Sequence, residues 1–277
     1  MKSLNSLGIE VEYFLQKPTG TYPPTIVNAQ KEMEHEILGF NINPPYPMGD
    51  GGNYLLVSHI HDVRLQTDGT PIEFQAFTDG GSSIGNKLHN LSPYDIHWFL
   101  GNFKTQIEKV EKTLLKGYKV NHQCYYQSNP ALAYCANFQD AGRVFGSEKT
   151  IYNAYDGSEK IQQKKDGDTK VTERTLGLHL HLGFVKKTVT QNRNLTDKIV
   201  RSLDSILDDY FQGEGDRGAG YFLREQKFQH KGIYRLKKQE SGVVTLEYRQ
   251  LTPMFLEKNL FTFLCLADKE ISRIIKI

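Results

Sequence analysis

The sequence predicts an α+β fold in which helices cover one face of an antiparallel or mixed sheet. Strand-like and helical stretches come in groups, without the regular strand–helix alternation that is typical of a parallel α/β sheet. The strand-like stretches alternate apolar with polar residues, which indicates a sheet with one face against a core. The chain has 277 residues, and we expect a single domain over residues 1–277.

Strand patterns recur along the chain. Residues 7–14 (LGIEVEYF) alternate apolar side chains with glutamates, which is typical of a strand. Further strands are expected over residues 54–60 and 71–77, and later over LGLHLHLGF and VVTLEYRQLT. Residues 67–70 (TDGT) have turn chemistry, and the polar, glycine-containing residues 157–171 are expected to form an exposed hairpin or loop.

Three stretches have helical periodicity. The first begins at Ser92, with Pro93 at its first position, and Gly117 follows it. The second is expected from about residue 195 to about residue 211, and the third runs from Pro253 to the C-terminus. The expected buried faces of the first two are Phe99, Phe103, Ile107, Val110 and Leu114, and Ile199, Leu203, Ile206, Leu207 and Tyr210.

Composition narrows the class of protein. The formal charge of +2 at pH 7 indicates neither a nucleic-acid partner nor a membrane surface. The chain has no run of about 18 apolar residues, and its N-terminal sequence is not that of a signal peptide. The 3 cysteines are irregularly spaced, which favours a reduced compartment, so we expect a cytoplasmic protein. The densest basic stretch, Lys227 to Lys238, is expected to be a solvated strand edge or loop.

Three predicted strands carry polar side chains two residues apart. Because residues i and i+2 of a strand share a face, each pair should project from one side of the sheet. For any single pair, the solvated face of an antiparallel sheet is the simpler explanation. Glutamate is a poor strand former, however, and lysine is absent from all three pairs, which favours a functional face. The pairs are Glu10 with Glu12, His179 with His181, and Glu247 with Arg249, and Glu73 adds a fourth carboxylate.

These residue types fit metal-assisted phosphoryl transfer. Magnesium is held by a few carboxylates together with substrate phosphates, and imidazole suits manganese or zinc as well. A guanidinium matches a phosphate or carboxylate as a planar fork. No GxGxxG follows a predicted strand, and the sequence contains no GxxxxGK[ST] phosphate loop and no HExxH zinc motif.

The motifs, taken in order, resemble the phage-type carboxylate–amine ligases, also called amidoligases, of the glutamine synthetase and glutamate–cysteine ligase superfamily. GIEVEYFL is similar to the opening strand of that family, DGTPIEFQAF to its internal strand and LGLHLHLGF to its histidine strand. FGSEKTIYNAY resembles its central motif, although Ser147, Glu148 and Lys149 stand where Cys, Asp and Pro are usual. KGIYRLKKQESGVVTLEYRQLTP resembles its C-terminal stretch, with a longer insert before EYR. The resemblance spans most of the chain and implies a glutamine-synthetase-like catalytic fold.

The same resemblance implies roles for individual residues. It implies magnesium or manganese ions that bridge the phosphates of ATP. Their implied ligands are Glu12, Glu73 and Glu247, with Glu10 a further candidate and His179 contacting metal or phosphate. His181 would face the acid substrate.

Four arginines are similar to anion-binding residues of the family. Arg249 would steady the phosphoryl group, and Arg235 in GIYR would bind a second anionic group. Arg217 and Arg224 flank or lie in the glycine-rich loop 213–220 and are further nucleotide-binding candidates. That loop and residues 43–52 (NPPYPMGDGG) are expected to close over the site.

The implied reaction is ATP-dependent ligation of a carboxylate to an amine through an acyl-phosphate. The substrates would be small molecules or peptides, in the host cytoplasm if the protein is encoded by a phage, and the chain could form an oligomer. Two alternatives remain open from the residues themselves. One is a metal-dependent phosphoesterase or nuclease, which also uses clustered carboxylates and histidines, and the other is a structural protein that retains the fold without activity.

Overall fold

The computed structural model describes residues 3–17, 25–27, 54–67, 72–78, 90–121, 149–162, 176–210, 231–239 and 242–276. Their strands and helices confirm the predicted α+β fold. The strands are β1 (Leu4–Lys17), β2 (Thr25–Val27), β3 (Leu55–Ser58), β4 (Val63–Thr67), β5 (Ile72–Phe77), β6 (Lys119–Asn121), β7 (Lys149–Asn153), β8 (Glu159–Gln162), β9 (Leu178–Phe184), β10 (Ile233–Lys238) and β11 (Val244–Leu251). The helices are η2 (Ile60–Asp62), α2 (Pro93–Thr113), α4 (Thr188–Gln191), α5 (Arg193–Tyr210), α7 (Met254–Glu257) and α8 (Leu260–Ile275).

All the described strands join one sheet. Its order is β3-β4-β5-β1-β9-β11-β10-β7-β8, and β2 and β6 pair with the C-terminal end of β1. Every described strand pair is antiparallel. The sequence predicted an antiparallel or mixed sheet, and the described sheet is antiparallel. The long strand β1 lies in the middle, between β5 and β9.

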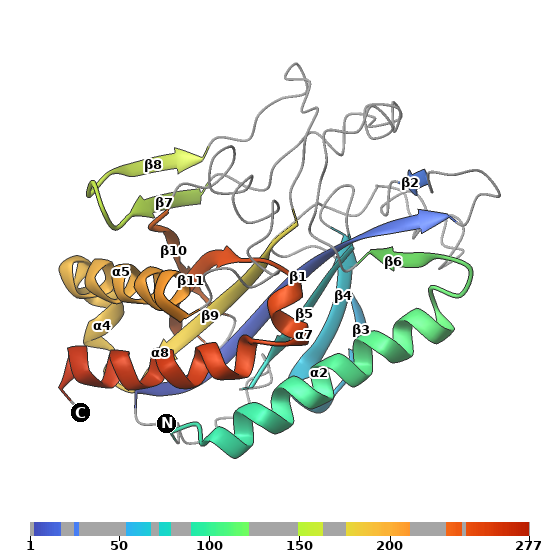
Figure 1. Cartoon of the computed structure of the whole chain (residues 1–277), viewed down its shortest axis with the longest axis horizontal. Helices are drawn as coiled ribbons and strands as arrows, with labels where there is room; N and C mark the ends of the chain where they lie inside the picture. Colours follow the sequence, from blue (N-terminus) through green and yellow to red (C-terminus); the bar gives the residue numbers. More distant parts are fainter. Residues whose placement is uncertain are drawn as a thin grey trace.

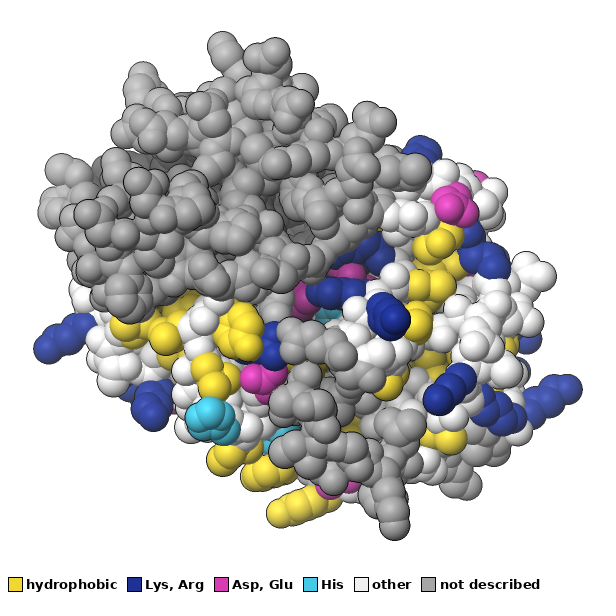
Figure 2. Space-filling view, turned by 180° about the vertical axis from the view of Figure 1, so that it is seen from behind, with side chains coloured by type: hydrophobic (Ala, Val, Ile, Leu, Met, Phe, Trp, Pro, Cys, Tyr) yellow, Lys and Arg dark blue, Asp and Glu magenta, His cyan; other side chains and the backbone are white. Residues whose placement is uncertain are grey.

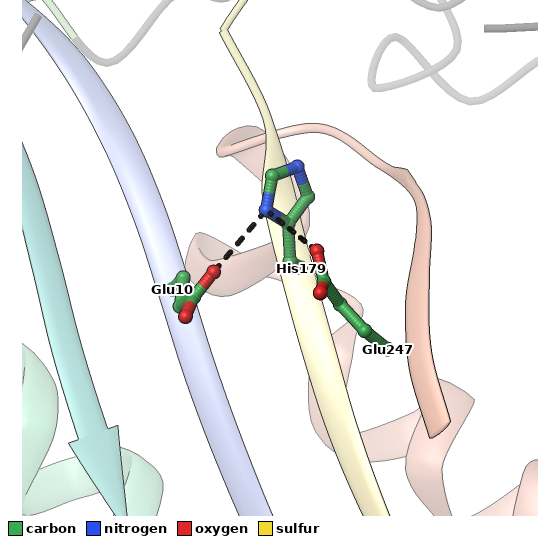
Figure 3. A group of neighbouring side chains, drawn as sticks. All are labelled: Glu10, His179 and Glu247. Carbon is green, nitrogen blue, oxygen red and sulfur yellow. Dashed lines mark hydrogen bonds and ion pairs between the residues drawn. The ribbon is translucent and has the colours of Figure 1, made fainter. Parts of the chain in front are cut away.

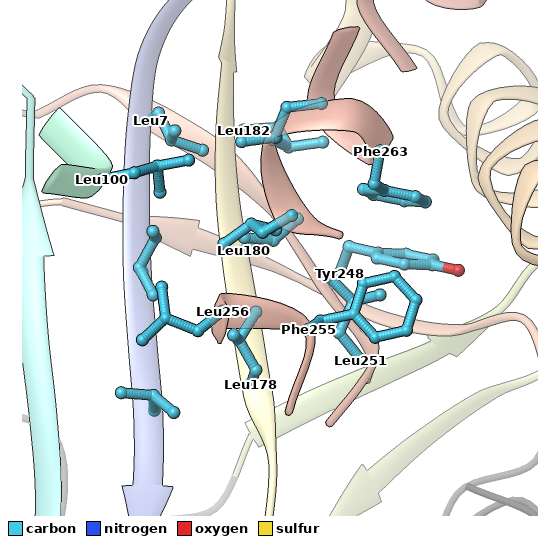
Figure 4. Close-up of a cluster of buried hydrophobic side chains, with 14 of the residues drawn as sticks. Leu7, Leu100, Leu178, Leu180, Leu182, Tyr248, Leu251, Phe255, Leu256 and Phe263 are labelled. Atoms are coloured by element: carbon cyan, nitrogen blue, oxygen red, sulfur yellow. The ribbon is translucent and has the colours of Figure 1, made fainter. Parts of the chain in front are cut away.

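The helices cover one face of this sheet. Figure 1 shows α2, α5 and α8 in front of the strands, and a shared core fills the space between the two layers. In Figure 4 the leucines of β9 meet Tyr248 of β11 and Phe263 of α8. Leu178, Leu180 and Leu182 are all fully buried, as the alternating pattern of that strand predicts. Among the described helices, none is long and apolar enough to cross a membrane.

The predicted elements are largely present, with shifted ends. The first helix begins at the predicted N-cap, where Ser92 Oγ accepts a 3.1 Å hydrogen bond from the Asp95 backbone N–H. The second spans Arg193–Tyr210, but Tyr210 is 63% exposed, so its assignment to the buried face was wrong. Tyr210 is the last residue of α5, and the buried positions of that helix end at Leu207.

Two local predictions need correction. The strand expected over residues 54–60 ends at Ser58, because His61 and Asp62 adopt positive φ values of 60° and 47° and turn the chain. β4 follows and was not predicted, although buried Val63 and Leu65 alternate with polar residues in it.

The C-terminal helix is also divided. Lys258 leaves the helical conformation, with φ −123° and ψ −54°, so that α7 and α8 are separate helices. Of residues 157–171, those up to Gln162 form the turn and second strand of the β7–β8 hairpin, and the rest lie outside the described residues.

Candidate metal and phosphate site

The sheet register places the predicted polar residues in one row. Glu10 of β1 lies opposite His179 of β9 on one side and Gln75 of β5 on the other. His181 of β9 lies opposite Glu247 of β11, which in turn lies opposite Arg235 of β10. These residues are on the face away from the helices, and Figure 2 shows acidic, basic and histidine side chains gathered near the middle of that side. The local pairs therefore become one continuous polar face.

Glycine makes room for the histidine strand at this point. Gly8 is the register partner of both His181 and Phe77. A Cβ at Gly8 would lie 3.1 Å from His181 Cβ and 2.4 Å from the nearest Phe77 ring atom. The His181 and Phe77 side chains therefore pack against the backbone of Gly8, and a larger residue at position 8 would displace them.

Three of the predicted residues could hold a metal ion. One ligand atom each of Glu10, His179 and Glu247 lies within 4.8 Å of the other two. His179 Nδ1 is 3.4 Å from Glu10 Oε2 and 3.7 Å from Glu247 Oε1. Figure 3 shows the imidazole between the two carboxylates, which come from the neighbouring strands. All three side chains are buried.

Protein donors hold the other oxygen of Glu10. Lys237 Nζ donates to Glu10 Oε1 at 2.7 Å, and Gln75 Nε2 donates to the same atom at 3.3 Å. His181 Nε2 lies 3.1 Å from it. Burial raises the pKa of Glu10, but Lys237 and His181 lower it more, so the pKa lies well below its ordinary value. Glu10 is therefore ionised at neutral pH.

Two arginines hold Glu247. Arg249 Nη1 donates to Glu247 Oε1 at 2.5 Å, and Arg235 Nη2 donates to the same oxygen. Burial raises the pKa of Glu247, but Arg235 and Arg249 lower it further, to well below its ordinary value. Burial and the neighbouring Arg235 guanidinium together lower the pKa of Arg249. Two cations thus share one carboxylate, which leaves positive charge available for an added anion.

Glu247 also has an oxygen suited to a metal. Its side chain is fully buried, and Oε2 has no hydrogen-bond partner among the described residues. A buried carboxylate oxygen without a partner is costly unless a cation or donor satisfies it. Two carboxylates and one imidazole form a donor set that can hold a divalent cation. The residues are therefore compatible with a bound divalent metal.

Two predicted metal ligands lie outside this group. Glu12 Oε2 accepts a 2.7 Å hydrogen bond from the Gly177 backbone N–H. Glu73 Oε1 accepts hydrogen bonds from Gln66 at 2.5 Å and from Gln75 at 2.6 Å. Both face the same side as Glu10 and are opposite each other in the register. The structure thus brings Glu10, the secondary candidate, to His179 and Glu247.

The site contains residues that the sequence patterns did not single out. Lys237 was assigned to a solvated strand edge or loop, and that assignment was wrong because its ammonium contacts the buried Glu10. Gln239 Nε2 lies 3.2 Å from His181 Nδ1 and donates to Thr245 Oγ1 at 2.8 Å. The available signal was alternation, since Arg235, Lys237 and Gln239 are two residues apart along and just beyond β10.

Several predicted features lie outside the described residues. They are Arg217 and Arg224, the glycine-rich loop 213–220, residues 43–52, and Ser147 and Glu148 of the central motif. Lys149 begins β7.

The described site can hold a divalent cation and an anion side by side. On the polar face, Lys237 contacts Glu10, and Arg235 and Arg249 contact Glu247. A divalent ion held by the two carboxylates would add positive charge and favour a phosphate next to the arginines. Such an arrangement stabilises a transferring phosphoryl group through charge and position.

Comparison with models of known protein families, with curated protein sequences and with solved structures found no match to this chain. The family resemblance therefore stays a prediction from the motifs.

Proposed function

We propose that this protein is an ATP-dependent carboxylate–amine ligase that uses magnesium or manganese. One observation carries the proposal: on one buried sheet face, Glu10, His179 and Glu247 could hold a metal ion, and Glu247 also accepts hydrogen bonds from two arginines. Metal ligands beside guanidinium groups can neutralise and position a transferring phosphoryl group. The motif resemblance adds the class of reaction.

The proposed reaction has two steps. The γ-phosphoryl group of ATP passes to an oxygen of the substrate carboxylate while its bond to ADP breaks. The amine nitrogen then bonds to the carboxyl carbon, the amine gives up a proton, and phosphate leaves with the former carboxylate oxygen. The bound metal supplies charge neutralisation on the phosphates.

The residues of the chain have distinct tasks in this proposal. Glu10, His179 and Glu247 hold the metal, and Arg249 and Arg235 bind the transferring group through their fork-shaped donors. Glu12 and Glu73, which lie further along the same face, are the candidates for a second metal ion. His181 is buried beside Glu10 and orients that carboxylate.

The test combines binding and turnover. Purified protein is expected to bind ATP only with magnesium or manganese, and to release ADP when supplied with the right acid and amine. Pools of amino acids, peptides and amines can be screened by ADP release, with mass spectrometry to detect the amide. Hydrolysis of phosphodiesters without ATP would instead support the phosphoesterase alternative.

Glu247→Gln and His179→Ala are expected to lower turnover at least about 100-fold, because each removes a group that neutralises or positions the phosphoryl group. The matched controls are Glu108→Gln and His97→Ala, whose side chains are exposed on α2. Circular dichroism checks that the variants stay folded. The site assignment is wrong if both site variants unfold, or if metal leaves the affinity for ATP unchanged.

A further inference from the structure

Lys237 contacts Glu10, a carboxylate that also belongs to the candidate metal group. Its Nζ donates to Glu10 Oε1 at 2.7 Å, while Glu10 Oε2 is the oxygen 3.4 Å from His179. One carboxylate therefore contacts the lysine on one side and the candidate metal group on the other. The Lys237 side chain is 22% exposed, whereas that of Glu10 is 4% exposed.

The lysine also borders the anion-binding arginines. Arg235 and Lys237 are two residues apart on β10 and share its polar side, whereas Lys238, the last residue of that strand, is exposed. The Lys237 side chain is an ammonium cation, and it donates to the Glu10 carboxylate at 2.7 Å. A divalent ion bound to Glu10 would be repelled by this charge.

An ammonium on a four-carbon stem can move where a guanidinium fork is held in place. We propose that Lys237 is an exchangeable counter-cation, which neutralises Glu10 before a metal binds and contacts the phosphate anion once the metal has taken that carboxylate. This inference rests on the metal and phosphate site proposed above. It makes Lys237 a binding residue for the phosphate chain, linked to the metal through Glu10.

The proposal predicts that removing the Lys237 charge changes the affinities for the metal and for the nucleotide in opposite directions. Lys237→Met keeps most of the apolar stem and removes the charge. Mn²⁺ alone should then bind about tenfold tighter, because the ammonium no longer competes with it for Glu10. The manganese complex of a non-hydrolysable ATP analogue should bind about tenfold weaker, because a charged contact to phosphate is lost. A purely structural lysine would move both affinities in the same direction or neither.

The experiment compares four folded proteins. Mn²⁺ alone is titrated into wild type, Lys237→Met, Lys237→Arg and Lys238→Met, with free Mn²⁺ followed by electron paramagnetic resonance. Binding of the analogue is then measured by calorimetry in saturating Mn²⁺. Lys237→Arg should keep the weaker Mn²⁺ affinity of wild type, and Lys238→Met should match wild type in both measurements. Lys237→Gln replaces Lys237→Met if the methionine variant does not fold.

The outcomes separate this inference from the proposed function. If wild type does not bind Mn²⁺, or if Glu247→Gln binds it equally well, the metal site itself is wrong. If wild type binds Mn²⁺ and Glu247→Gln does not, the metal site stands. Unchanged or jointly weakened affinities in Lys237→Met would then overturn only the role given to Lys237.

Discussion

Asp204 of α5 shows how a single buried carboxyl group makes stability depend on pH. Its side chain is fully buried on the helix-covered side of the sheet, where the Tyr248 hydroxyl donates a 2.7 Å hydrogen bond to it. Burial raises the pKa of Asp204 from 3.8 to about 6, although the bond from Tyr248 opposes that rise. Between these two values the folded state keeps a proton that the unfolded state has lost. Stability therefore falls as pH rises through this window and is level above it.

Replacing the Asp204 carboxyl group tests the direction in which stability changes with pH. Asp204→Asn keeps an acceptor for Tyr248 and removes the titration, so the loss of roughly 3 kcal/mol between pH 4 and pH 6 should shrink. The free energy of unfolding is measured by urea denaturation at several pH values. Asp209→Asn, an exposed change on the same helix, serves as control and should keep the wild-type profile. A similar profile for Asp204→Asn would show that another group causes the dependence.

At the scale of one element, α2 illustrates a helix whose start is encoded locally. Ser92 Oγ accepts from the Asp95 N–H at 3.1 Å, and the Asp95 carboxylate accepts from the Ser92 N–H at 2.7 Å. This reciprocal pair satisfies backbone donors that a helix leaves unpaired at its N-terminus. The helix then buries Phe99 and Phe103 against the core.

Ser92→Ala should lower the free energy of unfolding by about 1 kcal/mol, because the N-terminal N–H of Asp95 loses its acceptor. Thermal and urea denaturation give the size of the change. Ser205→Ala, in the middle of α5 and exposed, is the matched control and should change stability by less than about 0.5 kcal/mol. An equal effect of the two substitutions would contradict the capping role.

At the scale of the whole molecule, the two ends of the described chain are joined. The Ser3 N–H and Oγ donate to Asp268 Oδ1 at 2.9 Å and 2.5 Å, across 265 residues of sequence. Figure 1 shows the N- and C-termini on the same side of the molecule. Asp268 lies on α8, so the bond connects the start of β1 to the helix layer.

Asp268→Ala is expected to cost about 1–3 kcal/mol of stability, because the buried Ser3 N–H loses its acceptor and the Ser3 hydroxyl keeps only the Asp268 backbone carbonyl, at 3.3 Å. Chemical denaturation measures the loss. Glu270→Ala on the same helix removes an ion pair with the exposed Arg273 and an interaction with Ser202, and its expected cost is at most about 1 kcal/mol. The interpretation fails if the two variants are equally stable.

The sequence by itself determined the local features of this protein. Alternation predicted that Glu10 and Glu12 lie on the same side of their strand, that His179 and His181 lie on the same side of theirs, and that Leu178, Leu180 and Leu182 are core. Capping chemistry predicted the start of α2. Strand alternation and helix capping depend on neighbours within a few residues, so both can be predicted from the sequence without knowing the fold.

Only the tertiary structure decided which of these faces meet. Strand pairing places β1 between β5 and β9, and this register brings Glu10 to His179, and His179 to Glu247. It also brings Lys237 to Glu10 across 227 residues, a contact that no local period predicts. The physical reason is that a strand period states which side a residue faces, whereas its partners depend on long-range pairing of the whole sheet.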